Sequence, residues 1–161
     1  MSGAPEDVAP LVHATPVPVR FADTDRFGHV NNAAFATYVE TARIALITSL
    51  GYPLGGMILA HLAIDYRRQL HVGDPLVVLS RAESIGRTSI RLMHALVRPQ
   101  DARLAHGPGH PVPLAEAPTG DRIADVASVI VAFDYALDRS VQVPDSLRAA
   151  LAPFVGPMPP A

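Results

Sequence analysis

The segment "FADTDRFGHVNN", residues 21 to 32, places carboxylates, a histidine and amides within a short stretch. It lies between a strand-like run and a stretch of helical periodicity, so Asp25 would stand close to a helix N-terminus. That end of a helix presents backbone N–H groups without acceptors and a partial positive charge. A carboxylate beside such donors can attack a carbonyl carbon or deprotonate a water, while the donors stabilise the oxyanion. These are the minimum requirements for acyl-transfer hydrolysis.

The same residues also admit a purely structural interpretation. Asp23 and Asp25 are residues that favour Asx-turns, and either Asn31 or Asn32 is a natural N-cap. Gly28 permits unusual backbone dihedral angles, which serve a tight turn as well as the close approach of a ligand. From the residues alone, both interpretations remain open.

The hydrophobic pattern indicates which elements hold this segment. Alternating apolar residues predict a strand over "TPVPVRFAD", and helical spacing predicts one long helix from about 33 to 50. Four strand-like runs follow: "MILAHLAIDYRRQL", "LVVLSRAES", "TSIRLMHALVR" and "RIADVASVIVAFDYAL". The gaps between them are too short for crossover helices, so antiparallel pairing is expected. A short helix is predicted at "PDSLRAAL".

A sheet that curls around the long helix is the economical way to bury its apolar stripe. The alternative, a ferredoxin-like sandwich, would need a second full-length helix. A chain of 161 residues predicts a single domain, here 15–155, after a flexible N-terminus over 1–14. The Pro- and Gly-rich segment 99–121 is far longer than a hairpin connection, which predicts either a mobile insertion dispensable for folding or a functional flap.

Composition narrows the classes of function. The net charge of −2 gives no electrostatic case for nucleic acid or an acidic membrane as a partner. The chain has no cysteine, which removes disulfides and thiol nucleophiles and fits a reducing compartment. No secretory signal or membrane-spanning run is seen, so a cytoplasmic protein is expected. His106 and His110 lack partners at ligand spacing, so no metal site is expected.

The stretch "VRFADTDRFGHVNNAAFATYVETARI" resembles the signature of the 4-hydroxybenzoyl-CoA thioesterase-like branch of the hotdog-fold family. Downstream, "IDYRRQLHVGDPLVV" and "VIVAFDYALDRSVQVPDSLRAAL" resemble later parts of the same pattern, whereas 99–121 has no counterpart. The resemblance implies an α+β hotdog fold, an antiparallel five-stranded sheet wrapped around one long central helix. It also implies a homodimer or homotetramer in which each active site uses both subunits.

The resemblance implies a role for each matching residue. Asp25 takes the place of the catalytic carboxylate, as general base or nucleophile. Gly28 and the backbone N–H near Asn32 would bind the oxyanion. His29 would pack near the thioester or orient the loop, with turn stabilisation as its alternative. Because some hotdog enzymes take their acid from the helix, Glu40 is the reserve candidate.

The implied activity is hydrolysis of an acyl-CoA thioester without a cofactor. Arg87, Arg67 and Arg68 could bind the phosphates of coenzyme A. A non-catalytic acyl-CoA-binding hotdog protein is the alternative from another class of function. A hotdog hydratase is less favoured, because its Asp-x-x-x-x-His spacing is one residue longer than the spacing from Asp25 to His29.

Overall fold

The computed structural model describes residues 9–160. Within that range the chain forms one antiparallel seven-stranded sheet and two α-helices, joined by turns and short 3-10 segments. The strands are β1 (Leu11–Pro16), β2 (Met57–Tyr66), β3 (Val77–Ile85), β4 (Ser89–Pro99), β5 (His110–Pro113), β6 (Gly120–Asp134) and β7 (Arg139–Ser140). The helices are α1 (Asn32–Ser49) and α2 (Asp145–Leu151).

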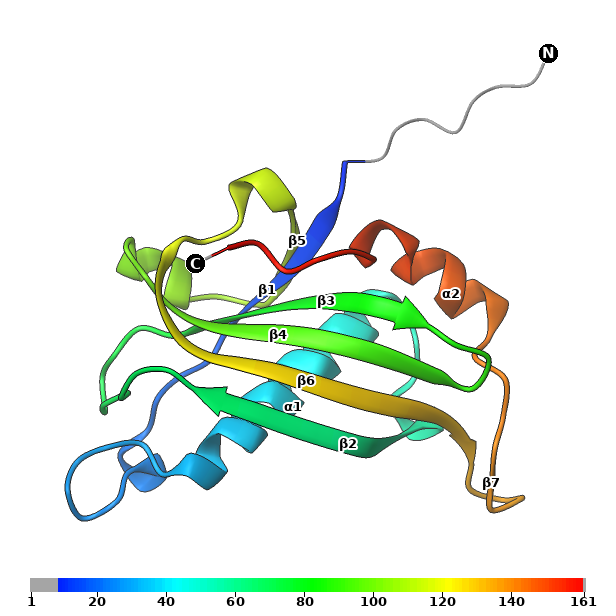
Figure 1. Cartoon of the computed structure of the whole chain (residues 1–161), viewed down its shortest axis with the longest axis horizontal. Coiled ribbons are helices and arrows are strands. Elements are labelled where there is room, and N and C mark those ends of the chain that lie inside the picture. Colours follow the sequence, from blue (N-terminus) through cyan, green and yellow to red (C-terminus); the bar gives the residue numbers. More distant parts are fainter. Residues whose placement is uncertain (1–8, 161) are drawn as a thin grey trace.

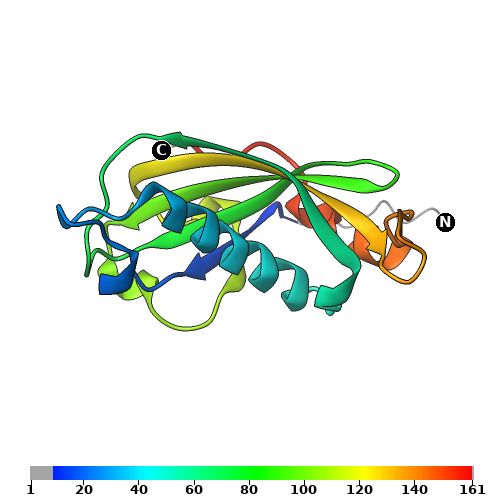
Figure 2. The same cartoon turned by 90° about the horizontal axis from the view of Figure 1, so that it is seen from below.

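Helix α1 lies along one face of the sheet, whose strand order is β2-β6-β4-β3-β1-β5 (Figures 1 and 2). The strand β7 pairs with the end of β6. The helix buries the apolar stripe that the sequence predicts, including Phe35, Val39, Ala42 and Leu46. The α+β class and the antiparallel pairing therefore agree with expectation, and α1 spans Asn32–Ser49 where a helix from about 33 to 50 was predicted.

The prediction of five strands is wrong, because segment 99–121 contributes β5 and the two-residue β7 follows β6. Within segment 99–121, β5 pairs antiparallel with β1, and Val112 stands opposite Val12 (Figure 1). Val112 and Leu114 pack against a cluster on the sheet face opposite α1, here called the outer cluster. Its buried members are Val12, Ala14, Val77, Leu79, Ala95 and Val97. The segment is thus part of the folded sheet and covers apolar surface.

The first strand also lies earlier than predicted. The pattern Val17–Val19–Phe21 indicated a strand, but β1 ends at Pro16 and residues 21–23 form a 3-10 turn. Val17 and Val19 still pack on the core from an extended segment outside the strand, so an alternating pattern arises without sheet pairing. Residues 11–14, expected to be flexible, belong to β1, and residues 1–8 lie outside the described range.

The C-terminal segment after α2 crosses the sheet face opposite α1 (Figures 1 and 2). The buried Arg81 of β3 fixes it, because its guanidinium donates to the backbone carbonyls of Phe154 and Val155. Farther along, Arg122 of β6 donates to the Pro159 carbonyl at 2.7 Å. The face opposite α1 is therefore covered by both the insertion and the chain's end.

The interior also contains buried histidines that pair with hydroxyl groups. The ring of His94 lies between Ser80 Oγ at 2.9 Å and Ser128 Oγ at 3.0 Å. His13 contacts Thr15 Oγ1 through Nδ1 at 2.9 Å. Both histidines are fully or almost fully buried. Burial lowers the pKa of His94 to about 3, with the charge of Arg43 acting in the same direction. Burial lowers the pKa of His13 to about 4.

These histidines predict that the fold loses stability in mild acid. Because their pKa values lie below about 6.5 only in the folded state, the unfolded chain binds more protons as the pH falls. Their contribution is complete above about pH 6.5 and declines below it, by about 2 kcal/mol for each histidine at pH 5. Urea unfolding at pH 7.5 and pH 5 measures this, and His94→Gln should flatten the dependence. Equal stability of the wild type at both values would contradict the assignment.

Candidate active site

The turn that carries Asp25 is held by its own backbone. Asp25 Oδ1 accepts hydrogen bonds from the backbone N–H groups of Phe27 at 2.8 Å and His29 at 3.2 Å. Gly28 adopts a φ of 82°, a left-handed conformation that favours glycine, and its N–H donates to the Asp25 carbonyl at 3.1 Å. Among residues 9–160, Asp25 Oδ2 accepts no hydrogen bond. One carboxylate oxygen therefore shapes the turn while the other remains available.

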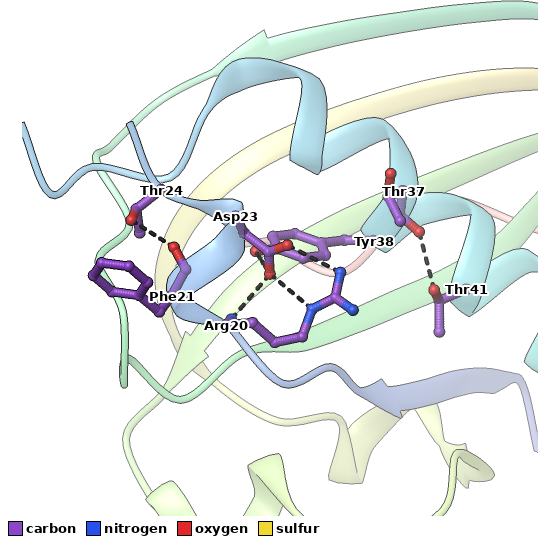
Figure 3. Close-up of polar contacts among 7 residues, drawn as sticks. All are labelled: Arg20, Phe21, Asp23, Thr24, Thr37, Tyr38 and Thr41. Carbon is purple, nitrogen blue, oxygen red and sulfur yellow. Dashed lines mark hydrogen bonds and ion pairs between the residues drawn. The ribbon is translucent and has the colours of Figure 1, made fainter. Parts of the chain in front are cut away.

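Asp23 has a different environment, although it lies only two residues away. Its carboxylate is buried and receives hydrogen bonds from Tyr38 of α1 and from Arg20 (Figure 3). The Tyr38 hydroxyl donates to Oδ2 at 2.9 Å, and Arg20 donates through its backbone N–H and its guanidinium. Asp23 thus fastens the start of the turn to the second turn of the helix.

The electrostatics of this anchor agree with its geometry. Hydrogen bonds from the Arg20 guanidinium hold the pKa of the Asp23 carboxyl below its usual value. Burial, together with the hydrogen bond to Asp23, raises the pKa of the Tyr38 hydroxyl. Asp23 is therefore a charged acceptor and Tyr38 a neutral donor at neutral pH. This contact is a structural anchor, which fits the expectation that Asp23 forms the turn.

The N-terminus of α1 begins directly after this turn. Asn31 is the N-cap, and its side chain accepts a hydrogen bond from the Ala33 N–H at 2.9 Å. Asn32 is the first helical residue, so its backbone N–H has no acceptor within the helix. The hydroxyl of Tyr66, at the end of β2, donates to the Asn32 carbonyl at 3.0 Å. The sheet and the turn together fix the position of this helix end.

Asp25 and the start of α1 line the same cavity, whose volume is about 500 Å³. Eleven residues form its wall: Asp25, His29, Val30, Asn31, Asn32, Phe35, Tyr66, Arg67, Arg68, Gln69 and Leu70. Five of the residues selected from the sequence therefore meet here, three from the turn and helix and two arginines from the segment after β2. The imidazole of His29 stacks edge-on against His71 with ring centroids 5.0 Å apart, which ties the turn to that segment.

Three other predicted residues lie outside this wall. Gly28 does not line it, and its N–H is engaged within the turn. Glu40 lines a second cavity of about 320 Å³, together with Arg43 of α1 and residues of β2. Arg87 lies in the β3–β4 turn, which contacts α2 through Arg148, at the opposite end of the sheet (Figure 1). One chain therefore brings neither Glu40 nor Arg87 to Asp25.

Sequence reasoning missed Tyr66 as a site residue. It lies in the predicted strand "MILAHLAIDYRRQL", where it was given no role, yet its hydroxyl supports the helix N-terminus and its ring packs on Phe35. Its location where β2 ends, directly before two arginines, is the signal that could have identified it. Asn31 was selected as a cap, and the structure places it in the wall as well.

Comparisons with known proteins agree on one family. The model of the "Thioesterase-like superfamily" matches residues 19–151. A solved thioesterase from Thermus thermophilus, complexed with coenzyme A and Zn, is 28% identical with a TM-score of 0.69. That alignment covers 87% of this chain and 97% of the Thermus chain. The 1,4-dihydroxy-2-naphthoyl-CoA thioesterase Slr0204 from Synechocystis has the same fold, with 18% identity, a TM-score of 0.69, and coverage of 87% and 95%.

The similarity to curated sequences is shorter. The candidate acyl-CoA thioesterase YneP of Bacillus subtilis (strain 168) is 33% identical over 69 residues, 38% of this chain and 50% of YneP. The chain spans about half the length of the curated relatives it matches. Of the helices in residues 9–160, none combines the length and apolar character needed to cross a membrane.

Proposed function

Because this chain belongs to the thioesterase-like superfamily and has its hotdog fold, we propose that it hydrolyses an acyl-CoA thioester to the free acid and coenzyme A. One observation carries the proposal: Asp25 lines the same cavity as the N-terminus of α1. A carboxylate and backbone N–H donors on one wall supply a base or nucleophile and an oxyanion site. The coenzyme A bound to the Thermus thioesterase supports this substrate class.

In the proposed mechanism, the thioester carbonyl oxygen lies at the start of α1. Asp25 Oδ2 removes a proton from a water as the water oxygen adds to the carbonyl carbon, and the carbonyl oxygen becomes an oxyanion. The Asn32 N–H and the helix N-terminus stabilise that charge. When the oxyanion collapses, the C–S bond breaks, and the proton held by Asp25 returns to the leaving thiolate. If Asp25 attacks the carbon directly, the C–S bond breaks, coenzyme A leaves as the thiolate and an anhydride of the acyl group with Asp25 forms. Water then hydrolyses this anhydride, which releases the acid, regenerates the Asp25 carboxylate and supplies the proton that the thiolate takes up.

An unbiased panel of short, long and aromatic acyl-CoAs tests the activity. Release of free thiol, followed with a chromogenic thiol reagent, is expected for at least one member of the panel. Tight binding of an acyl-CoA by the wild type without any release of thiol would instead favour the non-catalytic binding protein. Binding is measured separately with a non-hydrolysable CoA ester.

We also propose that two copies of the chain pair along β2. The opposite edge of the sheet ends in β5, a four-residue strand with prolines at 111 and 113, which discourages further pairing. The β2 edge is long and carries the exposed Leu59, close to the exposed Ile44 of α1. Such an edge is an association hazard unless it is paired.

Sedimentation velocity at micromolar concentration should therefore show a dimer, or a tetramer built from such dimers. Leu59→Glu, at an exposed apolar position of the β2 edge, should shift the population toward monomer because it places a charge in the proposed contact. An active monomer at micromolar concentration would contradict the proposal.

A further inference from the structure

A second recess adjoins the candidate active site and has a different chemical character. It has a volume of about 540 Å³ and is lined by Arg67, Arg68, Arg122 and Asp125. Arg67 and Arg68 line both this recess and the cavity that holds Asp25. These two arginines are therefore the shared rim between the two spaces.

The side chains in the recess are held in place from several directions. One carboxylate, Asp125, receives Arg67 Nε at 3.0 Å and Arg122 Nη1 at 3.1 Å. Arg122 also donates to Pro159 of the C-terminal segment, which places it on the sheet face opposite α1. Its Nε atom is buried without a partner in the described part of the chain. The guanidinium of Arg122 is thus preorganised by contacts that do not use all of its donors.

The backbone of the rim is fixed as well. The N–H groups of Arg67 and Arg68 both donate to the Ile123 carbonyl of β6, at 2.8 and 3.1 Å. Just beyond them, Arg98 donates to the Gln69 carbonyl at 2.9 Å and to Asp74 at 3.1 Å. The rim therefore has a defined position relative to the active-site cavity.

The recess has an excess of positive charge. Three guanidinium groups and one carboxylate leave a formal charge of 3 − 1 = +2. Asp125 is shared between Arg67 and Arg122, while Arg68 is exposed and has no ion-pair partner within residues 9–160. Guanidinium groups bind phosphate oxygens through paired, charge-assisted hydrogen bonds. A ligand with several phosphates would satisfy the donors that the carboxylate leaves free.

We propose that this recess binds the phosphates at the nucleotide end of coenzyme A, with Arg68 as the principal contact and Arg67 and Arg122 beside it. This assignment rests on the proposed function, because it supposes that the acyl end of the same molecule lies at Asp25. The pantetheine arm then passes over the Arg67–Arg68 rim into the active-site cavity. The proposed nucleotide site therefore lies in the same chain as Asp25 and does not include Arg87.

Binding of adenosine 3′,5′-bisphosphate tests the site without requiring any hydrolysis. Calorimetry at low ionic strength should show binding to the full-length wild type. Arg68→Gln should weaken it about tenfold, the scale of one lost charge-assisted hydrogen bond. Arg139→Gln, which removes an exposed arginine of β7 outside the recess, should change the affinity less than about twofold. Added salt should weaken binding to the wild type.

Kinetics with two substrates link the recess to turnover. Arg68→Gln should raise the KM for an acyl-CoA about tenfold with little change in kcat. Hydrolysis of the matching acyl-pantetheine, which lacks the nucleotide, should lose much less kcat/KM than hydrolysis of the acyl-CoA. An equal loss with both esters would overturn the assignment, because it would indicate damage to the active site instead.

The results also separate this inference from the proposed function. If the wild type binds the bisphosphate through Arg68 but hydrolyses no acyl-CoA, the nucleotide site stands and the hydrolase proposal fails. If the wild type hydrolyses acyl-CoAs but Arg87→Gln weakens bisphosphate binding while Arg68→Gln does not, the assignment of the nucleotide site to the recess is overturned. The hydrolase proposal then still stands. If the wild type does not bind the bisphosphate at millimolar concentration, the assignment of the nucleotide site to the recess is also overturned.

Discussion

Asp25→Asn should lower kcat for thioester hydrolysis by at least about a hundredfold, the usual scale for a lost general base. The amide keeps an oxygen that can accept from Phe27 and His29, so the turn should persist. What it loses is the negative charge needed to accept a proton or attack a carbon. Binding of a non-hydrolysable CoA ester should change little, since the helix N-terminus and the arginines of the rim remain. Steady-state thiol release and calorimetry measure the two effects separately.

Two further carboxylate variants serve as controls. Asp23→Asn should reduce kcat far less than Asp25→Asn, but it should lower thermal stability because it weakens the contacts with Arg20 and Tyr38. Glu40→Gln should retain activity, since Glu40 lines the other cavity. If Asp25→Asn hydrolyses thioesters at a near wild-type rate while Glu40→Gln is inactive, the catalytic carboxylate is Glu40 of α1. Retained activity in both would refute the carboxylate mechanism.

Replacing residues 100–119 with a four-residue turn should destabilise the fold by several kcal/mol. The change removes β5 from β1 and uncovers the outer cluster, whose packing partners in this segment include Val112 and Leu114. Loss of buried apolar contacts of this size costs on the order of 1.5–3 kcal/mol for each fully buried large side chain. Urea unfolding gives the free energy. This expectation reverses the one drawn from composition, which treated the segment as dispensable.

A milder pair of substitutions separates packing from length. Val112→Ala should lower the free energy of unfolding by about 1 kcal/mol, because it removes part of the cover over the outer cluster. Arg103→Ala, in the same insertion but with a side chain 90% exposed and paired with Asp101, should change it by less than about 0.5 kcal/mol. Unchanged stability after the full replacement would restore the view that this insertion does not support the fold.

Local patterns in the sequence predicted the elements that are governed by local contacts. The apolar spacing of α1 was sufficient because the helix buries one continuous stripe, and Asn31 caps it through a contact two residues away. The first strand was misplaced because Val17 is buried and Val19 is half-buried in a segment that belongs to no strand. The strand β5 was not predicted because its segment is rich in proline and glycine. Its pairing partner β1 lies almost a hundred residues earlier, so no local pattern indicates the pairing.

The same distinction applies to the candidate site. Asp25, His29 and Asn32 lie within one short segment, so their proximity could be predicted from the motif. The contribution of Tyr66 and the arrangement of Arg67 with Arg122 depend on how β2 registers against β6, which no local pattern specifies. By residue type alone Asp23 and Asp25 looked alike, and only the family resemblance singled out Asp25. The contact between Asp23 and Tyr38, made across fifteen residues, assigns one carboxylate to structure and leaves the other in the cavity.

The most direct test of the central claim is the rate of free thiol release from an acyl-CoA panel by the wild type and by Asp25→Asn, purified in parallel. We expect the wild type to turn over at least one acyl-CoA and Asp25→Asn to be at least about a hundredfold slower with that substrate. The folded state of both proteins is checked by their thermal transitions. Equal rates for two folded proteins, or no release of thiol by the wild type from any acyl-CoA, would contradict hydrolysis at Asp25.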